Sequence, residues 1–164
     1  MDKNVIQKMR QAIAQDDIDT VKMLMSENDD WMDVETATGS FLHDASKLGM
    51  YDIVCILVEE GMDVNKKGGM ADLTPVVEAA FSGKLKIIDY LYNHGANIYD
   101  EDFESNPLFA AIYNNHFEVV KYLVDKGIDT KVTYSIGDIE ECDAYEYARQ
   151  YGRTEIAEYL KALR

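Results

Sequence analysis

The chain has 164 residues, of which 47% are hydrophobic, enough for one continuous core but too few to argue for two. Its 31 acidic and 16 basic side chains give a formal net charge of -15, which opposes binding to nucleic acid or anionic membranes and favours a basic partner. No apolar run reaches the roughly 18 residues that a membrane span needs, so we expect a single cytoplasmic domain, residues 1–164.

The first predicted elements are a helix pair at 5–14 and 17–26. The first helix is the most polar in the chain, which is typical of a terminal repeat with one face toward water. Val21, Leu24 and Met25 form the inner stripe of the second helix. This pair is therefore predicted to be the N-terminal cap.

Three similar units follow at 40–65, 74–99 and 106–131. In the middle unit, Pro75 suits the first turn of a short helix, and Gly95 supplies the left-handed conformation that ends a second helix. Neither helix is long enough to be stable alone, so each unit has to pack on its neighbours. A last copy, from residue 143, is predicted to be the C-terminal cap.

A long insertion, 131–142, separates the last two units. Its first six residues alternate and are β-prone, and Gly137-Asp138 is a turn signal, so a short β-hairpin is predicted. Long ordered loops on a rigid scaffold often bind partners. A solvated loop whose acids serve solubility is the alternative.

Equivalent alanines set the register of the units. They lie 33, 34, 32 and 37 residues apart, at Ala12, Ala45, Ala79, Ala111 and Ala148. A period near 33 predicts an all-α solenoid of about five helix-turn-helix repeats, including the two caps.

The recurring motifs are specific. They include Thr74-Pro75 before Ala79-Ala80, Leu42-His43 before Ala45, and Gly61-Met62-Asp63-Val64-Asn65 after a second helix. This pattern resembles that of ankyrin repeats and covers essentially the whole chain. The chain departs from the family pattern in three ways: Phe41 and Ala144 replace the proline, Asn115 replaces the glycine break, and the first repeat is degenerate.

Catalytic and metal-binding patterns are missing from the sequence. His43 and His116 occupy positions where the family often has histidine, which implies hydrogen bonds between repeats and not metal ligands. There is no H-x-x-x-H or C-x-x-C spacing, and Cys55 falls in an apolar helix stripe. We therefore expect no enzyme, no cofactor, no metal and no disulfide framework.

The resemblance implies a partner-binding site. Variable contact positions in ankyrin proteins lie before the T-P motif and after the paired alanines, on a concave face. Aromatic side chains there are candidate anchors, although Phe103 could instead pack its loop on its own repeat. Two acidic stretches, 99–104 and 136–141, lie beside them. The predicted partner-binding residues are Lys47, Leu48, Met70, Leu73, Phe81, Asp100, Glu101, Asp102, Phe103, Glu104, Tyr113, Asn114, Tyr134, Asp138, Glu140, Glu141 and Tyr151.

Two classes of function follow. The first is a non-catalytic module, monomeric when free, that binds a basic protein. The chain resembles ankyrin-type immunity proteins, which neutralise a toxin such as a nuclease. It also resembles ankyrin adaptors or regulators of other cytosolic proteins. The second is a metal-dependent enzyme or small-ligand binder that uses groove carboxylates. The lack of catalytic motifs favours the first class.

Overall fold

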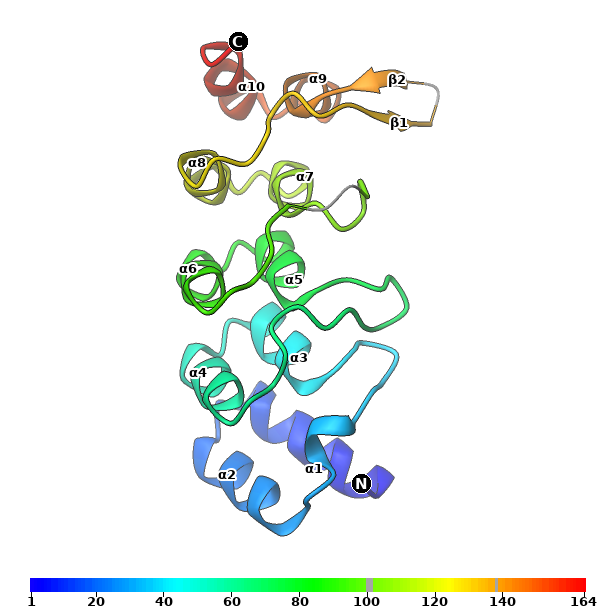
Figure 1. The fold of residues 1–164 in the computed structure, drawn as a ribbon, viewed down its shortest axis with the longest axis vertical. Coiled ribbons are helices and arrows are strands. Elements are labelled where there is room, and N and C mark those ends of the chain that lie inside the picture. The colour runs from blue at the N-terminus through cyan, green and yellow to red at the C-terminus, as the bar shows by residue number, and fades with distance from the viewer. Residues whose placement is uncertain (100–101, 138) are drawn as a thin grey trace.

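The computed structural model describes residues 1–99, 102–137 and 139–164, and it forms a solenoid of stacked helix pairs (Figure 1). Within these ranges the first helices of the pairs lie in one row: α1 (Lys3–Ala14), α3 (Phe41–Leu48), α5 (Pro75–Phe81), α7 (Pro107–Tyr113) and α9 (Ala144–Gln150). The second helices form an outer row: α2 (Ile18–Glu27), α4 (Tyr51–Glu59), α6 (Leu85–Asn93), α8 (Phe117–Asp125) and α10 (Thr154–Lys161). The predicted repeat solenoid is confirmed.

The segments that precede α3, α5, α7 and α9 all project to the same side of the stack, and we call them fingers (Figure 1). The last finger is the predicted hairpin, in which β1 (Tyr134–Ile136) pairs antiparallel with β2 (Ile139–Cys142). The finger before α3 packs on the finger before α5 by backbone contact, since the Met70 N–H donates to the Ala37 carbonyl at 2.9 Å. A side chain at Gly69 would lie 3.1 Å from the Gly39 nitrogen, so this approach needs glycine.

The alanines used to set the register are all buried, with at most 3% of their surface exposed. They belong to one core that runs from Met9 to Leu160 through every repeat. The turn between the helices of a pair uses a left-handed residue, and Asn115 takes this conformation with φ of 62°, as glycine does at position 83. Asp16, with φ of 55°, serves the same purpose in the first repeat.

Two histidines join consecutive repeats, as predicted. The His43 Nδ1 accepts from the Ser40 N–H at 3.1 Å, so its Nε2 carries the proton and donates to the Leu73 carbonyl at 2.9 Å. The His116 Nε2 lies 3.1 Å from the Phe81 carbonyl oxygen. Each imidazole therefore satisfies a carbonyl of a neighbouring repeat and fixes the spacing of the stack.

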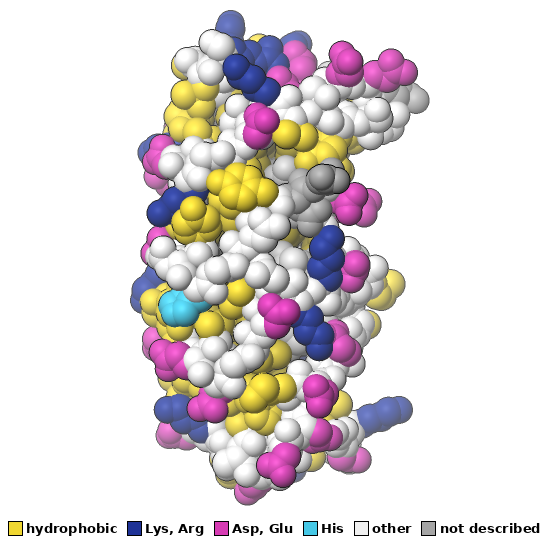
Figure 2. Space-filling model, in the orientation of Figure 1, with side chains coloured by type: hydrophobic (Ala, Val, Ile, Leu, Met, Phe, Trp, Pro, Cys, Tyr) yellow, Lys and Arg dark blue, Asp and Glu magenta, His cyan; other side chains and the backbone are white. Residues whose placement is uncertain are grey.

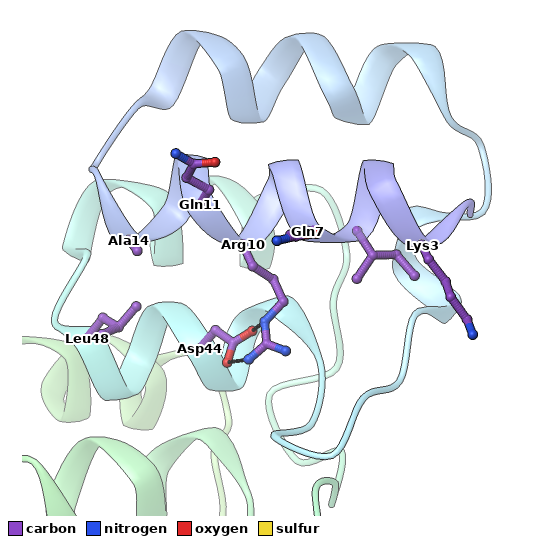
Figure 3. Close-up of a pocket in the computed structure, with 8 residues that line it drawn as sticks. Lys3, Gln7, Arg10, Gln11, Ala14, Asp44 and Leu48 are labelled. Carbon is purple, nitrogen blue, oxygen red and sulfur yellow. Dashed lines mark hydrogen bonds and ion pairs between the residues drawn. The ribbon is translucent and has the colours of Figure 1, made fainter.

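An ion pair joins the first cap to the stack (Figure 3). Arg10 on α1 places its Nε 2.8 Å and its Nη2 3.0 Å from the two carboxylate oxygens of Asp44 on α3. The Thr38 hydroxyl donates to the same carboxylate at 2.9 Å. Asp44 is only 7% exposed, whereas Arg10 is half-buried, so the carboxylate depends on the pair more than the guanidinium does.

We expect Arg10→Ala to destabilise the chain by about 1–3 kcal/mol, because it leaves the Asp44 carboxylate buried without its cation. Asp44→Asn should cost less than half as much, since the amide oxygen still accepts from Thr38 and Arg10 reaches water. Urea unfolding measures both, and hydrogen exchange in α1 should rise more in Arg10→Ala. Equal costs for the two variants would contradict this assignment.

Tyrosines on the outer row pack between consecutive repeats. Tyr51 meets Tyr90 edge to face at 5.7 Å between ring centroids, and Tyr122 donates to the Asp89 carboxylate at 2.8 Å. Burial, together with nearby Cys55 and Glu59, raises the pKa of Tyr90 to about 12. The folded protein therefore holds this proton more tightly than the unfolded chain does.

A stability loss at alkaline pH follows from this difference in pKa. Tyrosine in an unfolded chain has a pKa of about 10, so the stability from keeping Tyr90 neutral is complete below pH 10 and is lost as the pH rises toward 12. The free energy of unfolding should fall over this window, and Tyr90→Phe should make the fall shallower. Urea unfolding at stepped pH tests this, with Tyr113→Phe, at a side chain that is 41% exposed, as the control. Identical slopes for wild type and Tyr90→Phe would refute it.

Candidate functional site

A groove of about 460 Å³ lies where the first helices α5, α7 and α9 meet the fingers. The described residues that line it are apolar or aromatic except for one carboxylate: Ala71, Leu73, Val77, Phe81, Phe103, Glu104, Phe109, Ala110, Tyr113 and Tyr147. The helices form the floor of the groove, because neighbouring repeats do not cover all of their apolar surface. The fingers supply one wall.

Three exposed aromatic side chains form a row along this groove. Phe81 and Tyr113 are the last residues of α5 and α7, and Tyr151 directly follows α9; they are 42%, 41% and 41% exposed. Phe81 and Tyr113 are stacked at 6.0 Å with 21° between their planes, and Tyr151 meets Tyr113 edge to face at 5.2 Å. Each ring therefore supports the next while keeping one side in water.

A second group of rings lies under the finger wall. Phe103 contacts Phe109, Tyr134 and Tyr147 edge to face, with ring centroids 5.3, 5.6 and 5.4 Å apart. Phe109 is 2% exposed and Tyr147 is buried, and burial raises the pKa of Tyr147, which keeps its hydroxyl neutral. Phe103 thus packs its finger onto the last repeats and also lines the groove.

The backbone beneath the row is held from the next repeat. His116 bonds the Phe81 carbonyl at 3.1 Å, and Arg153 donates to the Tyr113 carbonyl. His116 and Arg153 both directly precede a second helix, at equivalent places in their repeats. A side chain at Gly83 would lie 2.6 Å from the His116 ring, so the turn after Phe81 fits closely. The two anchors therefore stand on fixed backbone, which lowers the ordering cost of binding.

Acidic side chains lie beside the groove. Glu104 is exposed at its edge, while Asp102 on the same finger lies 4.0 Å from the Lys67 ammonium. Glu140 and Glu141 are exposed on the hairpin, and acidic side chains are visible at the outer part of the hairpin in Figure 2. Lys and Arg gather at the end of the stack where α10 lies (Figure 2).

The structure brings together five of the predicted partner-binding residues in the groove: Leu73, Phe81, Phe103, Glu104 and Tyr113. Tyr151 continues the aromatic row, and Asn114 follows Tyr113 and bonds back to the Ala110 carbonyl at 3.4 Å. Met70 lies on the finger before α5 and is 91% exposed.

Other predicted residues lie elsewhere. Leu48 lines a separate hollow of about 540 Å³ between α1 and α3, with Gln7, Gln11 and Ala14 (Figure 3). Lys47 pairs with Glu78 at 3.3 Å. Tyr134 lines a further hollow and receives a hydrogen bond from the Asn106 amide at 3.1 Å. Asp100, Glu101 and Asp138 lie outside the described residues.

Sequence reasoning missed the residues that support the site. Phe109 and Tyr147 were absent from the predicted set because buried positions of the repeat look like ordinary core. His116 was predicted to bond between repeats but was not connected with Phe81, and Arg153 gave no signal except its position after a turn glycine. Cross-repeat contacts of this kind require the superhelical placement of the repeats.

No helix in ranges 1–99, 102–137 and 139–164 has the length and apolarity to cross a membrane. The same ranges contain no cluster of three His, Cys, Asp or Glu side chains that could hold a metal ion.

A family model for ankyrin repeats in three copies matches residues 42–134 and 76–163. A palmitoyltransferase of Lachancea kluyveri is 31% identical over 166 residues, which cover 98% of this chain and 22% of that protein. An ankyrin repeat protein of Acanthamoeba polyphaga mimivirus is 28% identical over 123 residues, 73% of this chain and 16% of that protein. An alpha-latrocrustotoxin of Latrodectus tredecimguttatus is 28% identical over 109 residues, which cover 66% of this chain and 8% of that protein. The chain thus spans less than a quarter of these relatives.

Proposed function

The chain belongs to the ankyrin-repeat family, whose repeats are protein-interaction modules, and from this premise we propose that it binds a basic partner protein in the groove over α5, α7 and α9. The activity is binding and not catalysis. The observation that carries the proposal is the row of Phe81, Tyr113 and Tyr151, which leaves aromatic surface in water, with the backbone of Phe81 and Tyr113 held by the next repeat. Rigid aromatic side chains of this kind are typical interface anchors.

The charge of the chain supports a basic partner. A net charge of -15 attracts cationic proteins over distance. Glu104 is exposed at the edge of the groove, and Glu140 and Glu141 are exposed on the hairpin. Attraction of this kind raises association rates more than it lengthens the life of the complex. Inhibition of the bound protein, as by an immunity protein that neutralises a toxin, stays a prediction, as does an adaptor role. None of the three relatives described above is named as an immunity protein.

Photo-cross-linking tests the location of the binding surface. A cross-linking amino acid in place of Tyr113 should capture a partner protein in the source cell, whereas the same residue in place of Met23 should not. Met23 is the matched control because it is 48% exposed and lies on the outer helix α2. Equal capture at both positions, or capture at position 23 alone, would refute the groove as the binding surface.

Neutralising acids near the groove should slow association with the captured partner. We expect the combined variant Asp102→Asn, Glu104→Gln, Glu140→Gln and Glu141→Gln to associate several-fold more slowly at low salt, with a smaller effect on dissociation. A matched variant, Asp19→Asn, Glu27→Gln, Asp29→Asn and Asp33→Asn, removes the same charge at the other end of the stack. Stopped-flow fluorescence measures both, and equal slowing would show that net charge alone steers the partner.

A further inference from the structure

The aromatic rings of this chain differ in whether a cation lies over them. On the outer row, the Lys86 ammonium lies 3.4 Å from the Tyr51 ring centroid. The Lys126 ammonium lies 5.0 and 5.1 Å from the rings of Tyr92 and Tyr122. Within the part of the chain that the structure describes, no Lys or Arg lies over a groove ring in this way. The water-exposed parts of Phe81 and Tyr113 are thus left open to a cation from another molecule.

Among the described residues, one charged side chain lines the groove, and it is a carboxylate. Glu104 is exposed at the edge and makes no ion pair with any described Lys or Arg. An apolar side chain that packed beside Glu104 would desolvate the carboxylate without offering it a hydrogen bond. An acidic side chain would be repelled. A cationic side chain offers both a partner for Glu104 and a charge for the ring faces.

The shape of the groove also suits a long cationic side chain. Lys and Arg carry an aliphatic stem that packs on apolar surface while the charged end stays near water. Ala71 and Leu73 on the finger before α5, and Val77 on α5, provide such a surface in the same groove. The charged end would then lie among Phe81, Tyr113 and Glu104, all of which line the same groove.

We propose that the groove is a receptor for one Lys or Arg side chain of the partner, held by the exposed sides of the stacked Phe81 and Tyr113 rings and by the Glu104 carboxylate. This inference rests on the proposed function, because it names the chemistry that the same groove recognises. It makes Glu104, Phe81 and Tyr113 the residues that determine specificity, and it gives Ala71, Leu73 and Val77 a packing role.

Titrations of the full chain with N-acetyl amides of arginine, lysine, norleucine and glutamate, followed by amide NMR shifts, test the inference. The arginine and lysine amides should shift Phe81, Glu104 and Tyr113 and bind about two- to fivefold more tightly than norleucine amide. Tyr113→Phe should keep this preference, and Tyr113→Leu, which stays apolar but loses the ring, should reduce it, because Phe81 and Glu104 remain in the groove. Glu104→Gln should weaken the cationic amides alone, and Lys86→Gln on the outer row should change nothing.

The outcomes separate this inference from the proposed function. Norleucine amide binding as tightly as arginine amide would overturn cation recognition. So would a preference that is as strong in both Tyr113→Leu and Glu104→Gln as in the wild type. So would the absence of any shift in the groove with all four amides. If the cross-linker at position 113 still captures a protein in these cases, the groove binds a partner through another chemistry. If that capture also fails, both proposals are wrong.

Discussion

Phe109→Ala should lower the free energy of unfolding by about 3–5 kcal/mol, the cost expected for a large buried ring. Phe109 is 2% exposed and its ring lies at 5.3, 5.1 and 5.1 Å from those of Phe103, Tyr134 and Tyr147, so its loss removes three aromatic contacts. The residue lies on α7, which packs on α5 and α9. The cavity would therefore fall where the last two repeats meet.

The matched control is Phe81→Ala, which removes the same side chain from a position that is 42% exposed. It should cost about 1 kcal/mol or less, because most surface substitutions have small effects. Urea unfolding by circular dichroism compares the two, and hydrogen exchange should show faster opening of α9 and α10 in Phe109→Ala than in Phe81→Ala. Similar costs would mean that Phe109 does not hold the last repeats in place.

The repeat register could be read from the sequence because it depends on local geometry. Alanine is needed where helices approach closely, and the left-handed residues after the helices have to be Gly or a tolerant residue such as Asn115. The hairpin followed from alternation and a turn signal, and it is present as β1 and β2. These features repeat with the chain, so spacing alone identifies them.

The candidate site was predictable only in part. Phe81 and Tyr113 stood out because the fold requires no aromatic side chain at their positions. Leu48 is equivalent to Tyr151 in the repeat, yet it faces a different hollow because α1 of the cap lies beside it. Tyr134 and Phe103 turn toward each other across 31 residues, and their contact depends on how the hairpin folds back. The repeat pattern predicts which face of the solenoid a residue lies on. Which side chains it contacts depends on how the repeats stack and on where insertions fold.

Binding should depend on Tyr113 more than on any other single groove residue. Its ring lies in the middle of the aromatic row, in contact with Phe81 on one side and Tyr151 on the other. Interface energy concentrates in central aromatic residues, where truncation often costs about 2 kcal/mol or more. For the partner captured through position 113, we therefore expect Tyr113→Ala to raise Kd by roughly 30-fold or more.

Phe81→Ala should raise Kd less than Tyr113→Ala, because Phe81 ends the row, and the double variant should cost less than the sum since the two rings support each other. Met23→Ala, on an exposed apolar residue of α2, should leave Kd within about twofold. Isothermal titration calorimetry measures all four, with urea unfolding to show that each variant is folded. Among the described rings, only that of Tyr113 contacts both Phe81 and Tyr151, so its loss interrupts the row. An unchanged Kd in folded Tyr113→Ala would therefore mean that the binding energy comes from residues outside this row.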